Sequence, residues 1–414
     1  MQSTYFEILG YSLSNSDSSI NSWLPQLLPL VPLVYSFTLM WWIPEGDKYV
    51  PGMVIISLLV FCFYSRRYLE LKLDGVRKKF LVSVWLLTLY QISVYFIKGD
   101  SWTELRALLT MAVYLSFLSF LKIRIFWLKL LLIISGSGLV VLTYGLYLAH
   151  GGRIGGFINP IPYATALAAV FSMIFLIAIH ERCLWKKNAL FLLSVAIFLA
   201  ILMTQTRGIA LPLVVFVPCV LVYWLIRERS FKFAISVLCI FFLLVMSGVY
   251  FISKGRIEAT SNEVAAIEAG NQTGSIGLRL QMWGAAFDIW RQRPVFGWGQ
   301  THSEALRAMY RSGDVSKALM DFNPPHYHNQ FIDMAVKKGA LGLAIFVFML
   351  YRAIAMVSAS SSPALRWGGS LLIALYLAAG LTDVPYRHPG TVYIFFSLVM
   401  SIYLAAPKRQ GIVR

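Results

Sequence analysis

Residues 253–338 form the one long stretch of this chain that a membrane would reject, and they include RPVFGWG at 293–299 and PPHYHNQ at 324–330. The segments on either side are apolar and long enough to cross a bilayer as helices, which takes roughly 20 residues each. We call residues 253–338 the polar segment. The pattern predicts a bundle of transmembrane helices that holds this polar segment at one face of a membrane, where we expect the chemistry.

The composition of the whole chain indicates a polytopic membrane protein. Of its 414 residues 58% are hydrophobic and 13% are charged, whereas a soluble domain has about 25% charged residues. The expected fold class is all-α and polytopic, with about 12 transmembrane helices and one long helical loop. The first span is predicted at 24–43 and the ninth at 231–252. We predict three domains: a membrane bundle of about nine spans at 1–252, the loop domain at 253–338, and about three C-terminal membrane helices at 339–414.

The net charge of +17 would suggest a nucleic-acid partner only if its distribution were ignored. Most basic residues lie in short loops between apolar spans, where they set the topology and meet anionic lipid head groups. No nucleic acid is therefore expected. The loops on the side of the two termini are the more basic ones, so the positive-inside rule predicts cytoplasmic termini and a polar segment outside the cytoplasm.

Two arginines are candidate anion ligands. Arg207 lies in TQTRG at 204–208, between two closely spaced spans, so it must lie at or slightly below the outer membrane boundary. An arginine at that depth usually has a partner, often an anion, although snorkelling to the interface is the alternative. Arg279 lies in the first turn of a helix predicted at 276–292 with Ser275 as its N-cap. There it adds a guanidinium to a positive helix N-terminus, with a surface salt bridge as the alternative.

The PPHYHNQ sequence supplies two candidate bases. His328 is suited to remove a proton from an attacking alcohol. His326 is the alternative base, and a structural role stays open for either ring. A metal site at this His-x-His pair would need a further ligand, and no nearby carboxylate or cysteine completes a set, so no metal is predicted.

Several familiar catalytic motifs are absent from the sequence. It has no phosphate-binding glycine loop ending in Gly-Lys-Ser/Thr, no Gly-x-Ser-x-Gly elbow and no His-Glu-x-x-His zinc helix. It also has no Asp-x-Asp pair that would hold a divalent cation on a nucleotide sugar. An enzyme built from these residues would have to neutralise a phosphate group with arginines instead of a metal.

Taken together, the motifs resemble those of the O-antigen ligase and O-antigen polymerase superfamily of bacterial inner membranes. The shared order is an Arg-Gly at a hairpin apex, an arginine opening a tryptophan-containing helix, RPVFGWG, a His-Asn pair, and KKGALGL at 337–343 opening a span. The resemblance covers about 200–350. It implies a GT-C-like glycosyltransferase in the inner membrane, with a periplasmic loop, no cofactor, and membrane lipids around it.

The resemblance also assigns roles to individual residues. Arg207 and Arg279 match the diphosphate-binding arginines of the family, and His328 matches its essential catalytic histidine. Asp383, in TDVP at 382–385, matches a weaker acidic position. The remaining expected supporting residues are His326, Asn329, Trp298 and Arg153.

The resemblance implies an undecaprenyl-diphosphate-linked O-antigen as the donor, and it leaves the acceptor open. A ligase would transfer the glycan to the outer-core sugar of lipid A-core, whereas a polymerase would extend the lipid-linked glycan itself. One long loop before the tenth span favours the ligase, and Arg153 in GGRIGG at 151–156 would suit its phosphorylated acceptor. A transporter or flippase of a lipid-linked anion is less favoured, because such proteins have charged mid-membrane sites and repeat symmetry.

Overall fold

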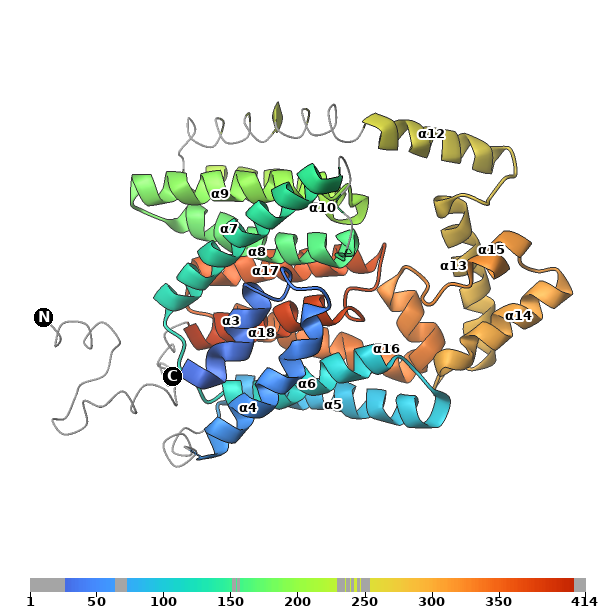
Figure 1. The fold of residues 1–414 in the computed structure, drawn as a ribbon, viewed down its shortest axis with the longest axis horizontal. Helices are drawn as coiled ribbons and strands as arrows, with labels where there is room; N and C mark the ends of the chain where they lie inside the picture. The colour runs from blue at the N-terminus through green and yellow to red at the C-terminus, as the bar shows by residue number, and fades with distance from the viewer. Residues whose placement is uncertain are drawn as a thin grey trace, which may run out of the picture.

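The computed structural model describes residues 27–63, 73–150, 154, 157–228 and 254–405, with a few single residues between 235 and 246. Over these ranges every regular element is a helix and none is a strand (Figure 1). The long helices run in roughly the same direction and form one bundle, and α13, α14 and α15 lie beyond one end of it (Figure 1). The predicted all-α class is therefore confirmed.

Seven helices of the described residues are long and apolar enough to cross a membrane. They are η3 with α4 (Gly46–Phe63), α5 (Gly75–Lys98), α7 (Ile125–His150), α8 (Pro160–His180), α9 (Leu184–Met203), α10 (Arg207–Glu228, up to Trp224) and α16 (Gln330–Ser358). The other helices of the bundle are η2 (Leu28–Leu30), α3 (Val31–Phe37), α6 (Trp102–Leu118), α17 (Pro363–Gly380) and α18 (Pro389–Ala405). The polytopic class is thus supported, and the count of twelve stays a prediction. The predicted span at 231–252 lies almost entirely outside the described residues.

The centre of the bundle is α8, which is buried along nearly its whole length. It packs against α9 and α17. Small residues allow close approach of these helices, since a Cβ on Gly368 would lie 2.9 Å from the Met173 sulfur and 3.3 Å from the Ser172 carbonyl. Such packing drives helix association in lipid, where apolar burial alone supplies little.

The first predicted span, 24–43, is wrong at its C-terminal end. The helix stops at Phe37, and the chain turns until Gly46 meets the carbonyl of Met40, a contact that leaves no room for a Cβ. The Tyr35 hydroxyl donates a hydrogen bond to the Gly46 carbonyl at 3.0 Å and fixes the turn. Most residues of this turn are apolar, like those of the helix, so hydropathy alone did not show where the helix ends.

The polar segment folds into α12 (Lys254–Glu268), α13 (Ser275–Gln292), η5 (Gly299–Thr301), α14 (His302–Ser312) and α15 (Lys317–Phe322). It has an apolar core of its own, which includes Met282, Ile289, Leu306, Leu319 and Tyr327. We therefore describe it as a small helical unit, and its boundaries at 253 and 338 stay a prediction.

The predicted helix at 276–292 is confirmed, but its cap differs from the prediction. Gly274 is the N-cap, and Ser275 is already helical. The first turn is capped from outside the helix, because the Glu263 carboxylate of α12 accepts a hydrogen bond from the Ile276 N–H. A carboxylate at this position complements the positive end of the helix dipole.

The helical unit is attached to the bundle at a break in α16. Gly339 has φ +69° and ψ −176°, which interrupts the helix. The 294–298 loop fills the break: Ala340 N–H donates to the Pro294 carbonyl at 2.7 Å, and Trp298 N–H donates to the Val336 carbonyl at 2.9 Å. Gly297 packs against the backbone of Gly339, where neither residue has space for a Cβ. The glycines of RPVFGWG and KKGALGL therefore let two backbones pair.

Candidate active site

Three connecting segments meet where the helical unit joins the bundle. They are the start of α10 at Arg207, the approach to α16 at 325–329, and the turn from α17 to α18 at 381–388. Gly208 packs against the Thr382 side chain with no room for a Cβ. The Asn329 side-chain amide donates to the Leu381 carbonyl at 3.3 Å. The contacts thus bring together residues that are far apart in the sequence.

A group of imidazoles surrounds one carboxylate at this junction. We call His326, His328, His388 and Asp383 the histidine cluster. His328 Nδ1 lies 3.5 Å from Asp383 Oδ1, and His388 Nε2 lies 3.3 Å from Asp383 Oδ2. The centroids of the His326 and His328 rings are 4.3 Å apart. Asp383 is 4% exposed, so its charge acts mainly on these rings.

The backbone of His328 is held in an uncommon conformation. Its φ is +49°, in the left-handed region that non-glycine residues rarely adopt. The His328 N–H donates to Nδ1 of His326 at 3.3 Å, which ties the two residues together. Such strain persists only where the surroundings fix it, and it is often found at functional sites.

The groups of the cluster differ in protonation state, with a charged carboxylate next to a neutral ring. Burial acts to raise the pKa of Asp383, but the adjacent His328 and His388 rings outweigh it and lower that pKa below its usual range. Burial, assisted by the neighbouring His328 ring, lowers the pKa of His326 to about 3. At neutral pH Asp383 is therefore ionised and His326 is uncharged, so His326 is a poor proton acceptor.

Of the two predicted arginines, Arg279 lies within electrostatic reach of this cluster, and Arg207 lies within electrostatic reach of Arg279. Burial lowers the pKa of Arg279, the negative charge of Asp383 opposes that shift, and the positive charge of Arg207 adds to it. Within the described part of the chain, neither guanidinium has a carboxylate at ion-pair distance. Two guanidiniums that act on each other electrostatically favour the binding of an anion.

The other expected supporting residues have mainly structural contacts. Asn329 caps α16 by accepting hydrogen bonds from Phe331 N–H and Ile332 N–H. The Trp298 indole N–H donates to the Ile289 carbonyl at 2.7 Å, and the Arg293 guanidinium lies 3.9 Å above its ring. These contacts anchor the end of α13, away from the histidines. Arg153 lies outside the described residues.

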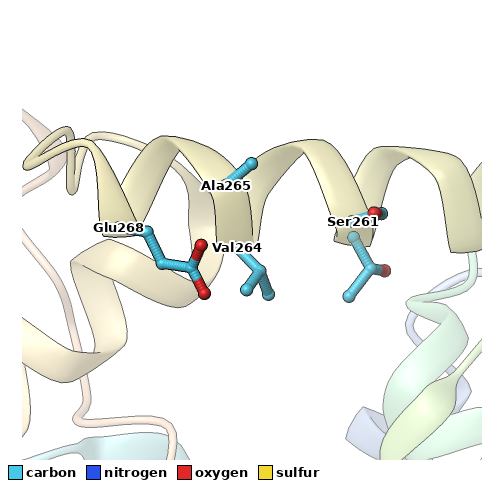
Figure 2. Close-up of a pocket in the computed structure, with 5 residues that line it drawn as sticks. Ser261, Val264, Ala265 and Glu268 are labelled. Carbon is cyan, nitrogen blue, oxygen red and sulfur yellow. The ribbon is translucent and has the colours of Figure 1, made fainter.

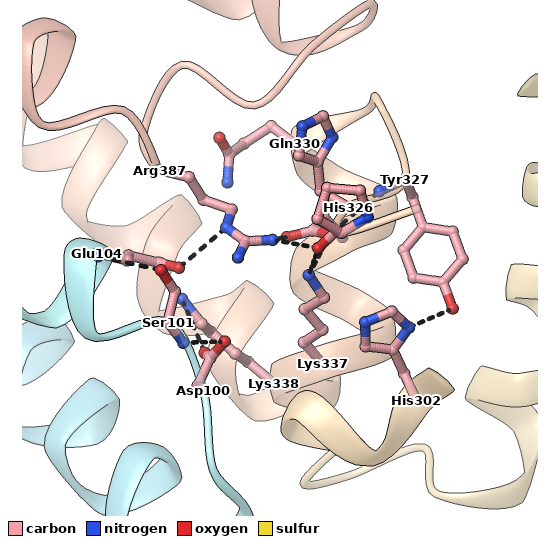
Figure 3. A network of polar contacts seen from close by, with 12 residues as sticks. Asp100, Ser101, Glu104, His302, His326, Tyr327, Gln330, Lys337, Lys338 and Arg387 are labelled. Carbon is pink, nitrogen blue, oxygen red and sulfur yellow. Dashed lines mark hydrogen bonds and ion pairs between the residues drawn. The ribbon is translucent and has the colours of Figure 1, made fainter. Parts of the chain in front are cut away.

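Beside the histidine cluster lies a buried set of charges that the sequence reading missed (Figure 3). We call it the ion network; its members are Asp100, Glu104, Asp333, Lys337, Lys338 and Arg387. Lys338 pairs with Glu104 and lies 4.0 Å from Asp100, and Lys337 lies 3.0 Å from Asp333. Arg387 joins the two halves, at 3.3 Å from Asp333 and 3.5 Å from Glu104. A signal was present, since charges at the ends of apolar spans are costly unless paired.

The ion network holds the segment that carries the histidines. Lys337 Nζ and Arg387 both donate to the Pro325 carbonyl, at 2.6 Å and 3.0 Å. The Asp333 carboxylate accepts a hydrogen bond from Tyr327 N–H at 3.2 Å. The Tyr327 hydroxyl lies 3.3 Å from His302, whose pKa burial lowers to about 4 (Figure 3). The backbone on both sides of His326 is therefore held by hydrogen bonds to the ion network.

Two cavities lie elsewhere on the helical unit. One, of about 550 Å³, is lined by α12 residues, and Figure 2 shows Val264 and Glu268 on the same side of that helix. Another, of about 580 Å³, lies between α13 and α14, with Asp288 and Asp314 in its wall. Neither is lined by a residue of the histidine cluster or by either arginine, so they do not mark the reaction site.

Comparison with known proteins relates part of this chain to one family. Residues 192–347 match a family model described as O-antigen ligase. The resemblance to the O-antigen ligase superfamily is confirmed. An O-antigen ligase of Escherichia coli K12 is 24% identical over 173 residues, which are 40% of this chain and 41% of that protein. An uncharacterized protein of Haemophilus influenzae is 28% identical over 163 residues, 38% of this chain and 40% of the relative.

The chain thus matches about two fifths of the length of these curated relatives. The O-antigen ligase match includes Arg207, Arg279 and His328. Asp383 and His388 lie beyond the matched residues. Their proximity to His328 is seen only in the structure.

Proposed function

We propose that this protein is a glycosyltransferase that moves an O-antigen glycan from undecaprenyl diphosphate to the outer-core sugar of lipid A-core. In this proposal the site faces the periplasm of the bacterial inner membrane, and the reaction needs no metal. The observation that carries it is that Asp383 faces His328 at 3.5 Å and also acts electrostatically on Arg279, which in turn lies within electrostatic reach of Arg207. The O-antigen ligase match, which includes Arg207, Arg279 and His328, supports it.

The two arginines would bind the donor diphosphate. Diphosphate is a leaving group whose negative charge grows as the glycosidic bond breaks, and fixed guanidiniums stabilise that charge. Arg207 is the first residue of α10, at the end of a predicted span. A lipid-anchored donor presents its head group at this depth.

His328 would act as the general base. The ionised Asp383 carboxylate faces Nδ1 at 3.5 Å and favours the tautomer that carries its proton there. Nε2 then has a free lone pair for the proton of the acceptor hydroxyl. The acceptor oxygen forms a bond to the anomeric carbon as the bond from that carbon to the diphosphate oxygen breaks, so the configuration inverts.

Reconstitution with purified lipids tests the proposal. The protein, lipid A-core and undecaprenyl-diphosphate-linked glycan are incubated in EDTA, and the products are separated by gel and identified by mass spectrometry. A ligase converts lipid A-core to a glycosylated product. NMR should show that the new glycosidic linkage has the anomeric configuration opposite to that of the donor. Lengthening of the lipid-linked glycan without use of lipid A-core would instead show a polymerase. Movement of the donor across vesicles without chemistry would show a transporter.

A further inference from the structure

We propose that His326, His328 and Asp383 form a binding site for one divalent transition-metal ion, of which Zn²⁺ is the best fit, and that the bound ion inhibits the transfer reaction. The binding follows from the geometry of the three side chains. The inhibition rests in addition on the proposed role of His328 as the base.

The three side chains have the spacing of a metal site. One ligand atom from each lies within 4.8 Å of the other two, and His328 Nδ1 and Asp383 Oδ1 are 3.5 Å apart. Zinc bonds to nitrogen and oxygen of about 2.0–2.2 Å in a tetrahedral site put neighbouring ligand atoms roughly 3.3–3.5 Å apart. The His328–Asp383 pair already matches this value, and the His326 ring needs to move by roughly 1 Å.

The ring nitrogens that face Asp383 lie at the long end of hydrogen-bonding distance. Among the described residues, the buried His328 Nδ1 and His388 Nε2 lie 3.5 Å and 3.3 Å from the Asp383 oxygens, but neither makes a well-aligned hydrogen bond. An unsatisfied buried polar atom is rare in a folded protein and requires an explanation. A cation bound by Asp383 Oδ1 and His328 Nδ1 provides one, and His388 next to Oδ2 would then orient the carboxylate.

The ligand set selects the kind of ion. Two imidazoles and one carboxylate suit Zn²⁺ and similar transition metals, whereas Mg²⁺ and Ca²⁺ prefer oxygen ligands. With three protein ligands, the fourth position stays open to water, as in zinc sites that are not purely structural. The charge of Arg279, which acts on Asp383, opposes a cation and makes the binding weaker than at a structural zinc site.

Binding of the ion removes the proposed base. A metal bound to Nδ1 of His328 uses the lone pair on that nitrogen, so the ring proton must lie on Nε2. Nε2 then has no lone pair with which to accept the proton of the acceptor hydroxyl. The ion also neutralises Asp383, which the reaction uses to orient the ring.

Direct metal binding by the full-length protein in detergent provides the test. The protein is stripped with EDTA, dialysed, and titrated with Zn²⁺ by elemental analysis and with Co²⁺ by its visible absorption. We expect one ion per chain, and at least about 100-fold weaker binding in His326→Gln and Asp383→Asn, because each removes a ligand. The matched control is His180→Gln at the end of α8, which should bind like the wild type. No saturable binding, or equal binding by the ligand variants, overturns the site.

The transfer assay separates this inference from the proposed function. Transfer in EDTA that Zn²⁺ inhibits and further EDTA restores is the expected result, and the residual transfer by His326→Gln should be insensitive to Zn²⁺. Saturable binding without any transfer activity would leave the site standing and overturn the function. A loss of activity in EDTA that Zn²⁺ restores would overturn the inhibitory role.

Discussion

The ion network and the histidine cluster lie side by side but differ in how completely their charges are paired. The network has three carboxylates and three cations, and each has an opposite charge within 4.0 Å. The cluster has one carboxylate among three imidazoles. Arg279 lies within electrostatic reach of it and of Arg207, and neither guanidinium has an ion pair among the described residues. Loss of one partner from a buried charge pair is strongly destabilising, whereas unpaired charges are available to a ligand. The comparison therefore favours a structural role for the network and agrees with the chemical role proposed for the cluster.

The largest expected effect comes from removing the base of the histidine cluster. His328→Ala should lower the rate of transfer by about 10²–10⁴-fold, the usual contribution of a general base, and leave the thermal midpoint nearly unchanged. His180→Gln serves as the matched control. The rate is measured as lipid A-core conversion, and a wild-type rate in His328→Ala would remove the proposed base.

The opposite pattern is expected in the ion network. Glu104→Leu deletes the main partner of the buried Lys338, and an uncompensated buried charge costs about 3–5 kcal/mol. Thermal unfolding in detergent should show a large loss of stability. The double variant Glu104→Leu with Lys338→Met should regain part of it. If the loss of stability in the double variant equalled the sum of the losses in the two single variants, the pairing of Glu104 with Lys338 would be contradicted.

Arg279 should affect activity and stability in opposite directions. Arg279→Gln removes a charge that stabilises the leaving diphosphate, and loss of one such donor lowers kcat about 10²–10³-fold. It also relieves the repulsion with Arg207, so the thermal midpoint should stay equal or rise. Arg279→Lys keeps the charge but not the bidentate geometry, so its kcat should lie between those of the wild type and Arg279→Gln. A strongly lowered midpoint in Arg279→Gln would show that the guanidinium is a structural partner.

Acid should destabilise the protein through two buried histidines. The pKa of His302 is lowered to about 4 and that of His326 to about 3, so the unfolded chain binds more protons below its histidine pKa of about 6.5. Stability should thus fall as the pH drops from about 6.5 toward 4, by at most about 1.4 kcal/mol per pH unit for each histidine. The thermal midpoint of the double variant His302→Gln with His326→Gln should vary less over this range. An unchanged pH slope would show that neither ring is held neutral.

The smallest effect is expected at Trp298. Trp298→Phe keeps most of the ring but removes the indole N–H that donates to the Ile289 carbonyl, which should cost about 1 kcal/mol. Transfer activity should stay within about two-fold of the wild type, because this contact anchors α13 and does not reach the histidines. A loss as large as that of His328→Ala would place Trp298 in the reaction site.

Features with a local origin were predictable. The helix at 276–292 was predicted, although its N-cap was not, and Asn329, which caps α16, is a residue type that favours this position. Others depend on contacts between distant segments. The break at Gly339 exists because the 294–298 loop hydrogen-bonds into α16, and periodicity gives no sign of it. Likewise, the His326–His328 pair gains its carboxylate only when the turn holding Asp383 folds against it.

The sequence was sufficient to establish a helical membrane protein with one long polar segment, and to select Arg207, Arg279 and His328 as candidates. Hydropathy and capping are properties of neighbouring residues, so they can be read along the chain. Only the tertiary structure decided which polar groups are paired and which have no opposite charge beside them. Pairing depends on distances between side chains of different helices, and these distances exist only after α5, α6, α16 and the 381–388 turn have packed together.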